Sequence, residues 1–498
     1  MNKNLLAIGL LILLPVWSGA QDFVDALRYS SAKIEGTARS GGMGNAFGAL
    51  GGDFTAVGIN PAGLGIYRSS EFAFTPNFGM TEVNSRYLGN SMTENDYKLR
   101  FNNISYVGAF NSKGGGSGSL VTVNFGLGFN RLKDFNSISI IEGFNADASF
   151  MDYITENANF DDWSEYYEEL AWQSDLLLYD TEGKVYWNDI QDAGYGQSQR
   201  KSITREGSLD EYTLALSLNF NHRFYLGASL GIDDLYYKES STLREKDDNN
   251  HIPYVNQYSF SSHLRTYGTG YNFKLGAIFK PVNEVRLGLS LATPTFFQMN
   301  DRFETGMESS ITYADNSSEN YSVTSPLMDY DYDLVTPFKA TLSGAFVVAK
   351  KGLISADLEY VDYSIAKLRN GGDGYDFIDQ NSDINEIYKP VTNFRLGGEY
   401  RITDAFSLRA GYENYPSAFN NNAFNTDQLN AGKNFSVISA GFGYTTGSFF
   451  LDVAYRQSSF SEYATLYPAP QTSDYPAPEF AKLDNKVSKI LFTLGFRF

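Results

Sequence analysis

The amino-acid sequence predicts an all-β fold, a 14-stranded antiparallel transmembrane β-barrel, and three observations support this prediction. First, many segments alternate apolar and polar residues, which is typical of a strand with one apolar and one polar face. Second, short and long connections between these segments follow each other in turn. Third, the chain is rich in aromatic residues and glycine, with 38 Phe, 35 Tyr and 46 Gly. Beyond Gln21 it has no apolar run long enough for a transmembrane helix, which needs roughly 20 residues.

The first twenty residues are predicted to be a secretory signal peptide, so the mature chain is expected to begin at Gln21. Lys3 supplies a positive charge, residues 5–14 form an apolar core, and Ser18-Gly19-Ala20 has the small residues of a cleavage site. The chain has no cysteine, which excludes a lipid-modified N-terminal cysteine and structural disulfides. We therefore expect an exported protein.

Residues 210–220 are the clearest predicted strand. Leu214, Leu216 and Leu218 fall on one face, whereas Ala215 and Ser217 fall on the other. Similar segments recur as far as the C-terminus, with charges confined to one face. The predicted strands cover residues 71–82, 101–111, 119–134, 210–220, 224–239, 257–279, 285–299, 334–348, 353–366, 390–400, 406–413, 435–444, 449–456 and 486–498. Their number is even, as in bacterial single-chain barrels.

The predicted connections are a second test of the barrel. Those after even-numbered strands are short, at 112–118, 221–223, 280–284, 349–352, 401–405 and 445–448. Those after odd-numbered strands are long, at 83–100, 135–209, 240–256, 300–333, 367–389, 414–434 and 457–485. Outer-membrane barrels have short periplasmic turns and long extracellular loops. The pattern indicates a Gram-negative outer membrane, with both chain ends in the periplasm and lipid around the barrel.

The last predicted strand ends in an aromatic residue. Its apolar positions alternate to the end of the chain, at Ile490, Phe492, Leu494, Phe496 and Phe498. A terminal strand of this kind resembles the signal that the outer-membrane assembly machinery recognises, so this machinery is an expected partner. The alternative is an ordinary amphipathic strand that ends the chain.

Residues 21–70 lack the pattern of a barrel strand and are rich in glycine and alanine. Small residues allow tight backbone packing, and a barrel of this size has an interior that must be filled or wet. We therefore expect this segment to fold into the lumen as a hatch. The predicted organisation is a signal peptide at 1–20, an N-terminal hatch inside the barrel at 21–70, and a transmembrane β-barrel with long extracellular loops at 71–498.

Asn60-Pro61-Ala62 stands just before the first predicted strand. Together with the Gly/Ala-rich segment, the predicted strand count and the terminal Phe498, it makes the chain resemble the FadL/TodX family. The tripeptide matches the family's Asn-Pro-Ala motif in the luminal hatch, and the match at residue level covers about residues 36–68. A simple turn is the alternative for these three residues. The resemblance implies an outer-membrane transporter that takes up long-chain fatty acids or aromatic hydrocarbons.

The resemblance also implies a route for a hydrophobic ligand, which is captured at the extracellular loops and leaves sideways through the barrel wall. In the family, an inward kink of the third strand interrupts the hydrogen bonding of the wall. Gly126 and Gly128 lie on the inner face of the third predicted strand, and glycine tolerates such a kink. Small inward residues that make room for the hatch are an equally good explanation.

Two places are expected to bind the ligand. Residues 161–179 read as a helix within the 135–209 loop, and its apolar candidates are Trp163, Tyr167, Leu170 and Trp172. Packing against neighbouring loops is the alternative for these side chains. Phe23 and Leu27 at the start of the mature chain are further candidates, since the mature N-terminus inserts into a ligand pocket in the family. A disordered N-terminus is the competing view.

Ten charged residues on predicted inner faces are expected to form a luminal network that anchors the hatch. They are Arg286, Asp357, Glu359, Arg395, Glu399, Arg401, Arg409, Glu413, Asp452 and Arg456. A structural role is favoured over contact with a ligand carboxylate.

Other classes of function have weaker support. A net charge of -19 argues against nucleic-acid binding, which needs a basic face. The chain has three histidines and no catalytic or zinc-binding motif, so we expect no enzyme activity, no metal site and no cofactor. A lipase built on His263 with a nearby serine is the alternative. The acidic clusters Asp247-Asp248 and Asp331-Tyr332-Asp333 could bind calcium, but they lack a full ligand spacing, and solvated surface charge is the favoured explanation.

A rival function keeps the fold and changes the task. Some barrels of the FadL superfamily, such as PorV, are partners in protein secretion or surface attachment, and fold alone does not settle function. A general diffusion porin is disfavoured by the predicted hatch. We expect a monomer whose ligand is a hydrophobic small molecule. Uptake and export both fit the pattern, as do fatty acids, hydrocarbons, other lipids and haem-like molecules.

Overall fold

The structure is a computed structural model that describes residues 22–111, 120–160, 163–349, 351–421 and 429–498. The predicted signal peptide and the predicted turn at 112–118 lie outside these residues. None of the helices described is long and apolar enough to cross a membrane. The described strands form one large antiparallel sheet and one separate two-stranded sheet.

The sheet closes on itself because its first and last strands pair with each other. β1 (Glu71–Tyr87) pairs on one side with β2 (Asn90–Asn111) and on the other with β21 (Ala481–Arg497), for example between Phe72 and Phe496. The predicted barrel of 14 antiparallel strands is therefore confirmed. Going round from β2, the unbroken strands are β7 (Ser198–Phe220), β8 (Phe224–Lys246), β9 (Val255–Phe279), β17 (Pro390–Arg401), β18 (Phe406–Tyr415), β19 (Phe435–Thr446) and β20 (Phe449–Ala464).

Four of the fourteen barrel positions are each built from two consecutive strands. They are β3 (Leu120–Asp134) with β4 (Ser137–Gly143), β10 (Val285–Ala292) with β11 (Phe296–Thr312), β13 (Met328–Val335) with β14 (Lys339–Val348), and β15 (Gly352–Asp362) with β16 (Lys367–Arg369). Pro294 and Pro337 lie in two of these breaks, where proline cannot donate a ladder hydrogen bond. The break between β15 and β16 contains the 3-10 turn η2 (Tyr363–Ile365).

The strands extend further than the alternation predicts. β2 begins at Asn90 instead of residue 101, β7 at Ser198 instead of 210, and β20 ends at Ala464 instead of 456. Where the strands follow the predicted alternation, outward side chains such as Leu289 and Leu291 are each 53% exposed, as a lipid-facing surface requires. Beyond the membrane the outward face meets water and carries polar side chains, so the extensions lose the period-two signal.

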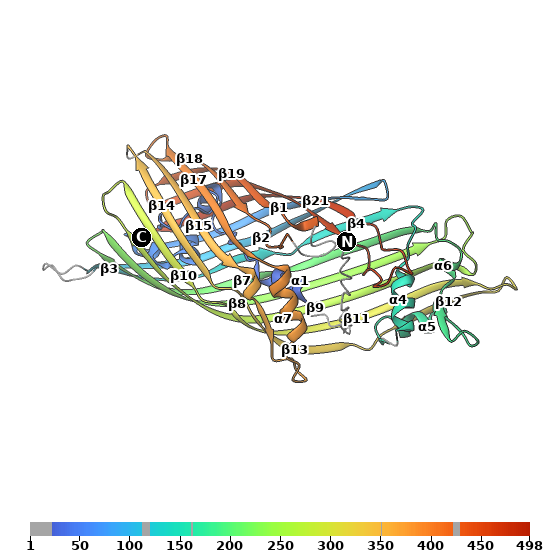
Figure 1. Ribbon diagram of the computed structural model, residues 1–498. Helices are drawn as coiled ribbons and strands as arrows, with labels where there is room; N and C mark the ends of the chain where they lie inside the picture. Colours follow the sequence, from blue (N-terminus) through green and yellow to red (C-terminus); the bar gives the residue numbers. More distant parts are fainter. Residues whose placement is uncertain (1–21, 112–119, 161–162, 350, 422–428) are drawn as a thin grey trace, which may run out of the picture.

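The two ends of the barrel differ (Figure 1). The C-terminus and short turns such as 221–223 lie at one end. Helices α4 (Phe150–Asn159), α5 (Glu168–Gln173) and α6 (Asp189–Asp192) lie at the other end, together with β12 (Ser318–Thr324) and the small hairpin of β5 (Leu178–Asp180) and β6 (Val185–Trp187). The longer connections therefore lie at one end, but the connection predicted at 83–100 is wrong, because β1 and β2 continue through it to a turn at Leu88-Gly89. We call this end the cap.

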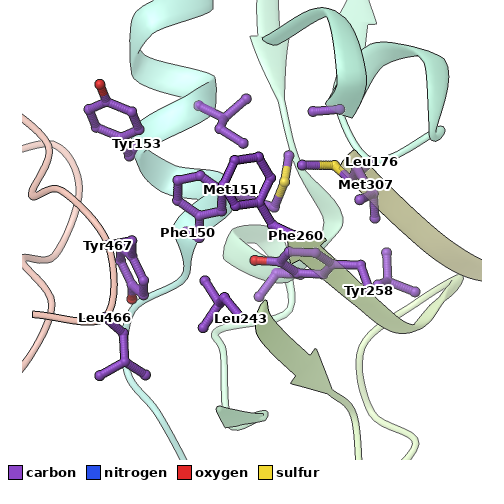
Figure 2. Packing of buried hydrophobic residues seen from close by; sticks show 14 of the residues in the cluster. Phe150, Met151, Tyr153, Leu176, Leu243, Tyr258, Phe260, Met307, Leu466 and Tyr467 are labelled. Atoms are coloured by element: carbon purple, nitrogen blue, oxygen red, sulfur yellow. The ribbon is translucent and has the colours of Figure 1, made fainter. Parts of the chain in front are cut away.

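A hydrophobic core fills the cap (Figure 2). Phe150 and Met151 of α4 pack against Phe260 of β9 and Met307 of β11, and the Phe150 and Phe260 rings lie 4.9 Å apart. Tyr467, from the connection after β20, lies against Phe150 with ring centres 5.7 Å apart. The connection that contains α4 and the connection after β20 are thereby held against β9 and β11, far from them in sequence.

Candidate functional site

The N-terminal segment lies inside the barrel and contacts its wall on several sides. The Ala38 N–H donates to Thr493 Oγ1 of β21 over 2.7 Å, and the Gly48 N–H donates to Asp357 Oδ2 of β15 over 3.1 Å. Its helices are α1 (Phe23–Ser30), α2 (Ala38–Gly42), α3 (Thr55–Ile59) and the 3-10 helix η1 (Pro61–Ile66). Most side chains between residues 36 and 65 are buried. The segment therefore occupies the lumen.

The Asn60-Pro61-Ala62 motif begins a helix and attaches it to the wall. The Asn60 side chain caps η1 by accepting from the Ala62 N–H over 3.1 Å, while Pro61 occupies the first helical position. The same side chain donates to the carbonyl oxygens of Gly48 over 2.7 Å and of Ala277 in β9 over 3.2 Å. The motif thus does more than the simple turn that was its alternative.

Three inward glycines on adjacent strands make room for this motif. A Cβ atom at Gly227 of β8 would collide with the backbone of Pro61, and one at Gly276 of β9 with the Asn60 side chain. A Cβ atom at Gly288 of β10 would lie 2.6 Å from the carbonyl oxygen of Gly48. These three glycines were not predicted to contact the motif, although their inward positions in the alternation were a usable signal.

A network of charges also joins the segment to the wall. Arg409 lies 2.7 Å from Glu399 and 2.6 Å from Asp452, and Arg39 of α2 joins Glu399 at 3.1 Å. Glu35 of the N-terminal segment pairs with Lys489 of β21 at 2.7 Å.

The remaining predicted network residues also form ion pairs or hydrogen bonds inside the barrel, with the exception of Arg401. Arg456 bridges Glu413 at 2.6 Å and Glu35 at 3.4 Å, and Arg395 lies between Asp357 and Glu359. Arg286 donates to the carbonyl oxygen of Leu50 over 2.7 Å. Arg401 was wrongly placed in the network, because it is exposed at the end of β17. Glu399 contacts the N-terminal segment directly, as do Arg456, Asp357 and Arg286. The other network residues form ion pairs along the wall.

Gly126 and Gly128 on β3 pack against the N-terminal segment. Each added Cβ would press on the Phe54 ring, and at Gly126 also on Leu64 at 3.1 Å. β3 keeps its pairing with β2 and β7 through both glycines, at Val107 and Ala215 for Gly126 and at Ser105 and Thr213 for Gly128. The glycines therefore make room for Phe54 and Leu64, which were not among the predicted site residues. An opening at this position stays a prediction.

Outside the barrel, an open apolar groove runs over the same part of the wall. It has a volume of about 520 Å³ and is lined on β2, β3, β7 and β8 by side chains that include Ile104, Leu127, Leu214 and Leu230. Gly128 belongs to its lining as well. A single glycine backbone therefore separates this groove from Phe54 in the lumen.

The cavity in the middle of the lumen is small and polar. Its volume is about 80 Å³, and Lys33, Lys274, Lys339, Glu211 and Glu359 are among its lining residues. Lys274 forms an ion pair with Glu211. In this conformation the cavity suits a few water molecules better than a large apolar ligand.

The N-terminal residues Phe23 and Leu27 belong to α1, so this part of the chain is ordered as a helix. Asp22 caps it by accepting from the Val24 N–H over 2.8 Å. The Phe23 ring lies 6.3 Å from that of Tyr388, which follows α7 (Ile378–Ile387). Phe23 and Leu27 pack at the edge of a core formed by α1, α7 and the wall, and neither lines the central cavity.

The structure separates the four candidates from the 135–209 loop into two pairs. Leu170 is buried in the core of the cap and Tyr167 packs against it, with its ring stacked 5.5 Å from Phe260. Trp163 and Trp172 are exposed on the outside of the cap. The four side chains therefore do not line one common site.

The predicted helix at 161–179 was too long. Among the described residues of this stretch, only α5 (Glu168–Gln173) is α-helical. Asp175 has a φ of 56°, a left-handed conformation that ends the helical path, and Leu176 and Leu177 then turn into the core.

Metal-binding clusters and a serine–histidine pair are the two further kinds of site to consider. Among the described residues, no three His, Cys, Asp or Glu side chains are arranged to hold a metal ion. His263 Nδ1 lies 3.2 Å from Ser240 Oγ, so a serine does lie near His263, as the lipase alternative requires. His263 is exposed on the strand surface, however, and the pair lines none of the cavities described above.

The fold and this site define a class of protein: a closed membrane β-barrel whose N-terminal segment fills the lumen. The sequence profile of the family described as "outer membrane protein transport protein (OMPP1/FadL/TodX)" matches residues 197–498, more than half of the chain. The chain belongs to this family of outer-membrane transport proteins.

Solved structures agree in fold. The crystal structure of a FadL homologue from Pseudomonas aeruginosa has 15% sequence identity and a TM-score of 0.57, and the match covers 93% of this chain and 98% of that chain. A mutant of the monoaromatic hydrocarbon channel TodX has 13% identity and a TM-score of 0.50, with 93% and 99% covered. At these identities the likeness shows the fold alone. A search of curated protein sequences finds no match.

Proposed function

We propose that this protein carries hydrophobic small molecules across the outer membrane and passes them through the barrel wall beside Gly128. The observation that supports this most directly is the apolar groove of about 520 Å³ outside Gly128, with Phe54 on the inner side of the same glycine. An apolar solute that leaves here enters lipid and avoids the aqueous periplasm. The cost of exposing its surface to water, about 25 cal/mol per Å², is then avoided.

In this proposal the N-terminal segment is a hatch that has to move. The small polar cavity in the lumen admits no continuous apolar path past Lys33 and Lys339. Movement of Phe54 and Leu64 away from β3 would open space beside Gly126 and Gly128. The hydrogen bonds of Asn60 and the ion pairs of Glu35 and Arg39 would hold the rest of the segment in place meanwhile.

Capture at the cap is part of the same proposal. Tyr167 and Leu170 would contact a ligand only when the core of the cap loosens, since both are packed inside it. With the cap outside the cell, Phe498 and the short turns would face the periplasm, where the assembly machinery recognises the last strand. We propose a monomer, because β1 and β21 pair within one chain, so the first and last strands of the barrel have no free edge to pair with another copy.

Filling the outer groove tests this route. Leu127→Trp places a large side chain in the groove without touching Phe54, because Leu127 points outward from β3. We expect uptake of a labelled long-chain fatty acid or of toluene to fall about tenfold, as for a barrier raised by about 1.4 kcal/mol. Uptake is measured in cells that lack their own carriers, at matched amounts of protein in the outer membrane.

The matched control is Leu289→Trp. Leu289 lines a second outer groove, of about 430 Å³, over β7 to β10, behind which the Asn60-Pro61-Ala62 motif lies. Uptake by this variant should equal that of the unaltered protein. Equal uptake by both tryptophan variants would reject an exit beside Gly128, and the absence of uptake by the unaltered protein would reject the transport function.

One observation favours a second candidate function, a partner role in protein secretion or surface attachment. The lumen is closed by a segment that is fixed through ion pairs and hydrogen bonds, and its remaining cavity of about 80 Å³ is polar. A barrel with such a lumen can serve as a membrane platform without conducting anything. Native mass spectrometry of the purified protein distinguishes the two, because a transporter should carry bound lipid and a platform a bound protein.

A further inference from the structure

The outer surface of the cap carries a cluster of exposed aromatic side chains around Tyr186. The ring of Tyr186 lies 5.5 Å from that of Trp163, 6.2 Å from Trp172 and 4.9 Å from Tyr179. Trp163 and Tyr179 are each 40% exposed and Trp172 is 46% exposed. Val185, 43% exposed, adjoins Tyr186 on β6. We call these five residues the aromatic patch. Exposed apolar patches of this kind commonly mark binding surfaces.

The backbone under the aromatic patch is held firmly to the cap. The Tyr186 N–H donates to Asn159 Oδ1 over 2.8 Å, and Asn159 Nδ2 donates back to the Tyr186 carbonyl over 2.9 Å. The indole N–H of Trp163 donates to Glu169 over 2.9 Å. Because these bonds fix the hairpin on α4 and orient one of the indoles, the patch is organised in the absence of a partner, which lowers the entropic cost of binding.

The patch lies in strongly acidic surroundings. Residues 163–192 include eight acidic residues and a single lysine. Glu165, Asp180, Glu182 and Asp192 are exposed. Aromatic faces and carboxylates both attract cations, and in this stretch only Lys184 opposes that charge.

We propose that the aromatic patch docks an arginine-rich segment of another protein outside the cell. A guanidinium group stacks on indole and phenol rings and also pairs with carboxylates, so it uses both features of this surface. A purely apolar partner would gain nothing from the acidic rim. A neutral sugar would stack on the rings without using the charges, and an anionic membrane surface would be repelled by them. This proposal does not depend on whether the barrel transports a ligand.

The tryptophans make the proposal directly measurable. Beyond residue 21 the chain has three tryptophans, Trp163, Trp172 and Trp187, and all lie in or beside the aromatic patch. The probe is a fluorescein-labelled peptide of six Gly-Arg repeats, titrated with the full-length mature protein in an uncharged detergent. We expect saturable binding by fluorescence anisotropy. An unlabelled copy of the peptide should change the intrinsic tryptophan fluorescence.

The binding should depend on both the rings and the charges. Trp163→Ala with Trp172→Ala should weaken binding about tenfold or more, the loss of two cation–π contacts. Glu165→Gln with Glu182→Gln keeps every ring and should weaken binding several-fold. An increase from about 50 to about 300 mM NaCl should also weaken it several-fold. Leu327→Ala removes an exposed apolar side chain between β12 and β13, outside the aromatic patch, and should change nothing.

Three results would overturn the proposal. The first is no saturable binding of the arginine peptide. The second is binding that the double tryptophan variant leaves unchanged. The third is salt-independent binding of a neutral oligosaccharide such as maltohexaose with no binding of the peptide, which would make the aromatic patch a sugar platform.

Discussion

Gly276 on β9 shows how one missing side chain allows the N-terminal segment to seat. A methyl group there would collide with the Asn60 side chain and with Pro61. Gly276→Ala should therefore disrupt the hydrogen bonds from Asn60 to Gly48 and Ala277, at a cost of about 1–3 kcal/mol. Thermal unfolding in detergent, followed by loss of the segment's protease resistance, measures this. The control is Gly344→Ala, where nothing lies within 4 Å of the added methyl. Equal melting temperatures for the two variants would contradict the seating role of Gly276.

Asp152 on α4 makes the cap sensitive to pH. Its carboxylate accepts from the Ser149 N–H over 2.8 Å, yet burial raises the pKa of Asp152 from 3.8 to about 7. A raised carboxyl pKa means that folding favours the protonated form. The stability that this group contributes is therefore fully present below about pH 4 and is lost as the pH rises towards 7.

We expect α4 to open more readily at pH 8 than at pH 5, as measured by hydrogen exchange of its amides after correction for intrinsic rates. Asp152→Asn cannot ionise and should lose most of this difference. If the substitution leaves the pH dependence unaltered, another group is responsible.

At the scale of elements, α4 holds the connection between β20 and β21 in place through one carboxylate. Glu156 accepts from the backbone N–H groups of Gln471, over 2.5 Å, and Thr472, over 2.7 Å, and from the Thr472 hydroxyl. Glu156→Ala leaves these donors without this acceptor, and local stability should fall by about 2 kcal/mol. Limited proteolysis within residues 466–480 should accelerate accordingly. Glu308→Ala, at an exposed position of β11, should cleave like the unaltered protein. Equal cleavage rates for all three proteins would show that Glu156 does not hold the connection.

At the scale of the whole molecule, the wall and its contents are separable. The pairing of β1 with β21 closes the barrel without help from residues 22–66. Deletion of these residues should leave a heat-modifiable barrel with a wet lumen, since the inner faces carry charges such as Arg409 and Asp452. Planar-bilayer recordings should show a steady ion conductance that the full protein lacks. Deletion of residues 22–30 alone removes α1 and leaves the Asn60 anchor, so its conductance should stay low. A silent barrel after the longer deletion would show that other segments block the lumen.

Sequence alone determined the number of strands, the alternation of connections and the presence of a compact Gly/Ala-rich segment before β1. These follow from local rules, because lipid on one side and a polar lumen on the other impose a period of two on each strand. Tertiary structure alone decided that Gly126 and Gly128 seat Phe54, that Tyr167 and Leu170 face the core of the cap, and that Trp163 and Trp172 face outward. Those facts depend on which residues meet across strands and loops far apart in the chain. Periodicity within one segment carries no information about such meetings.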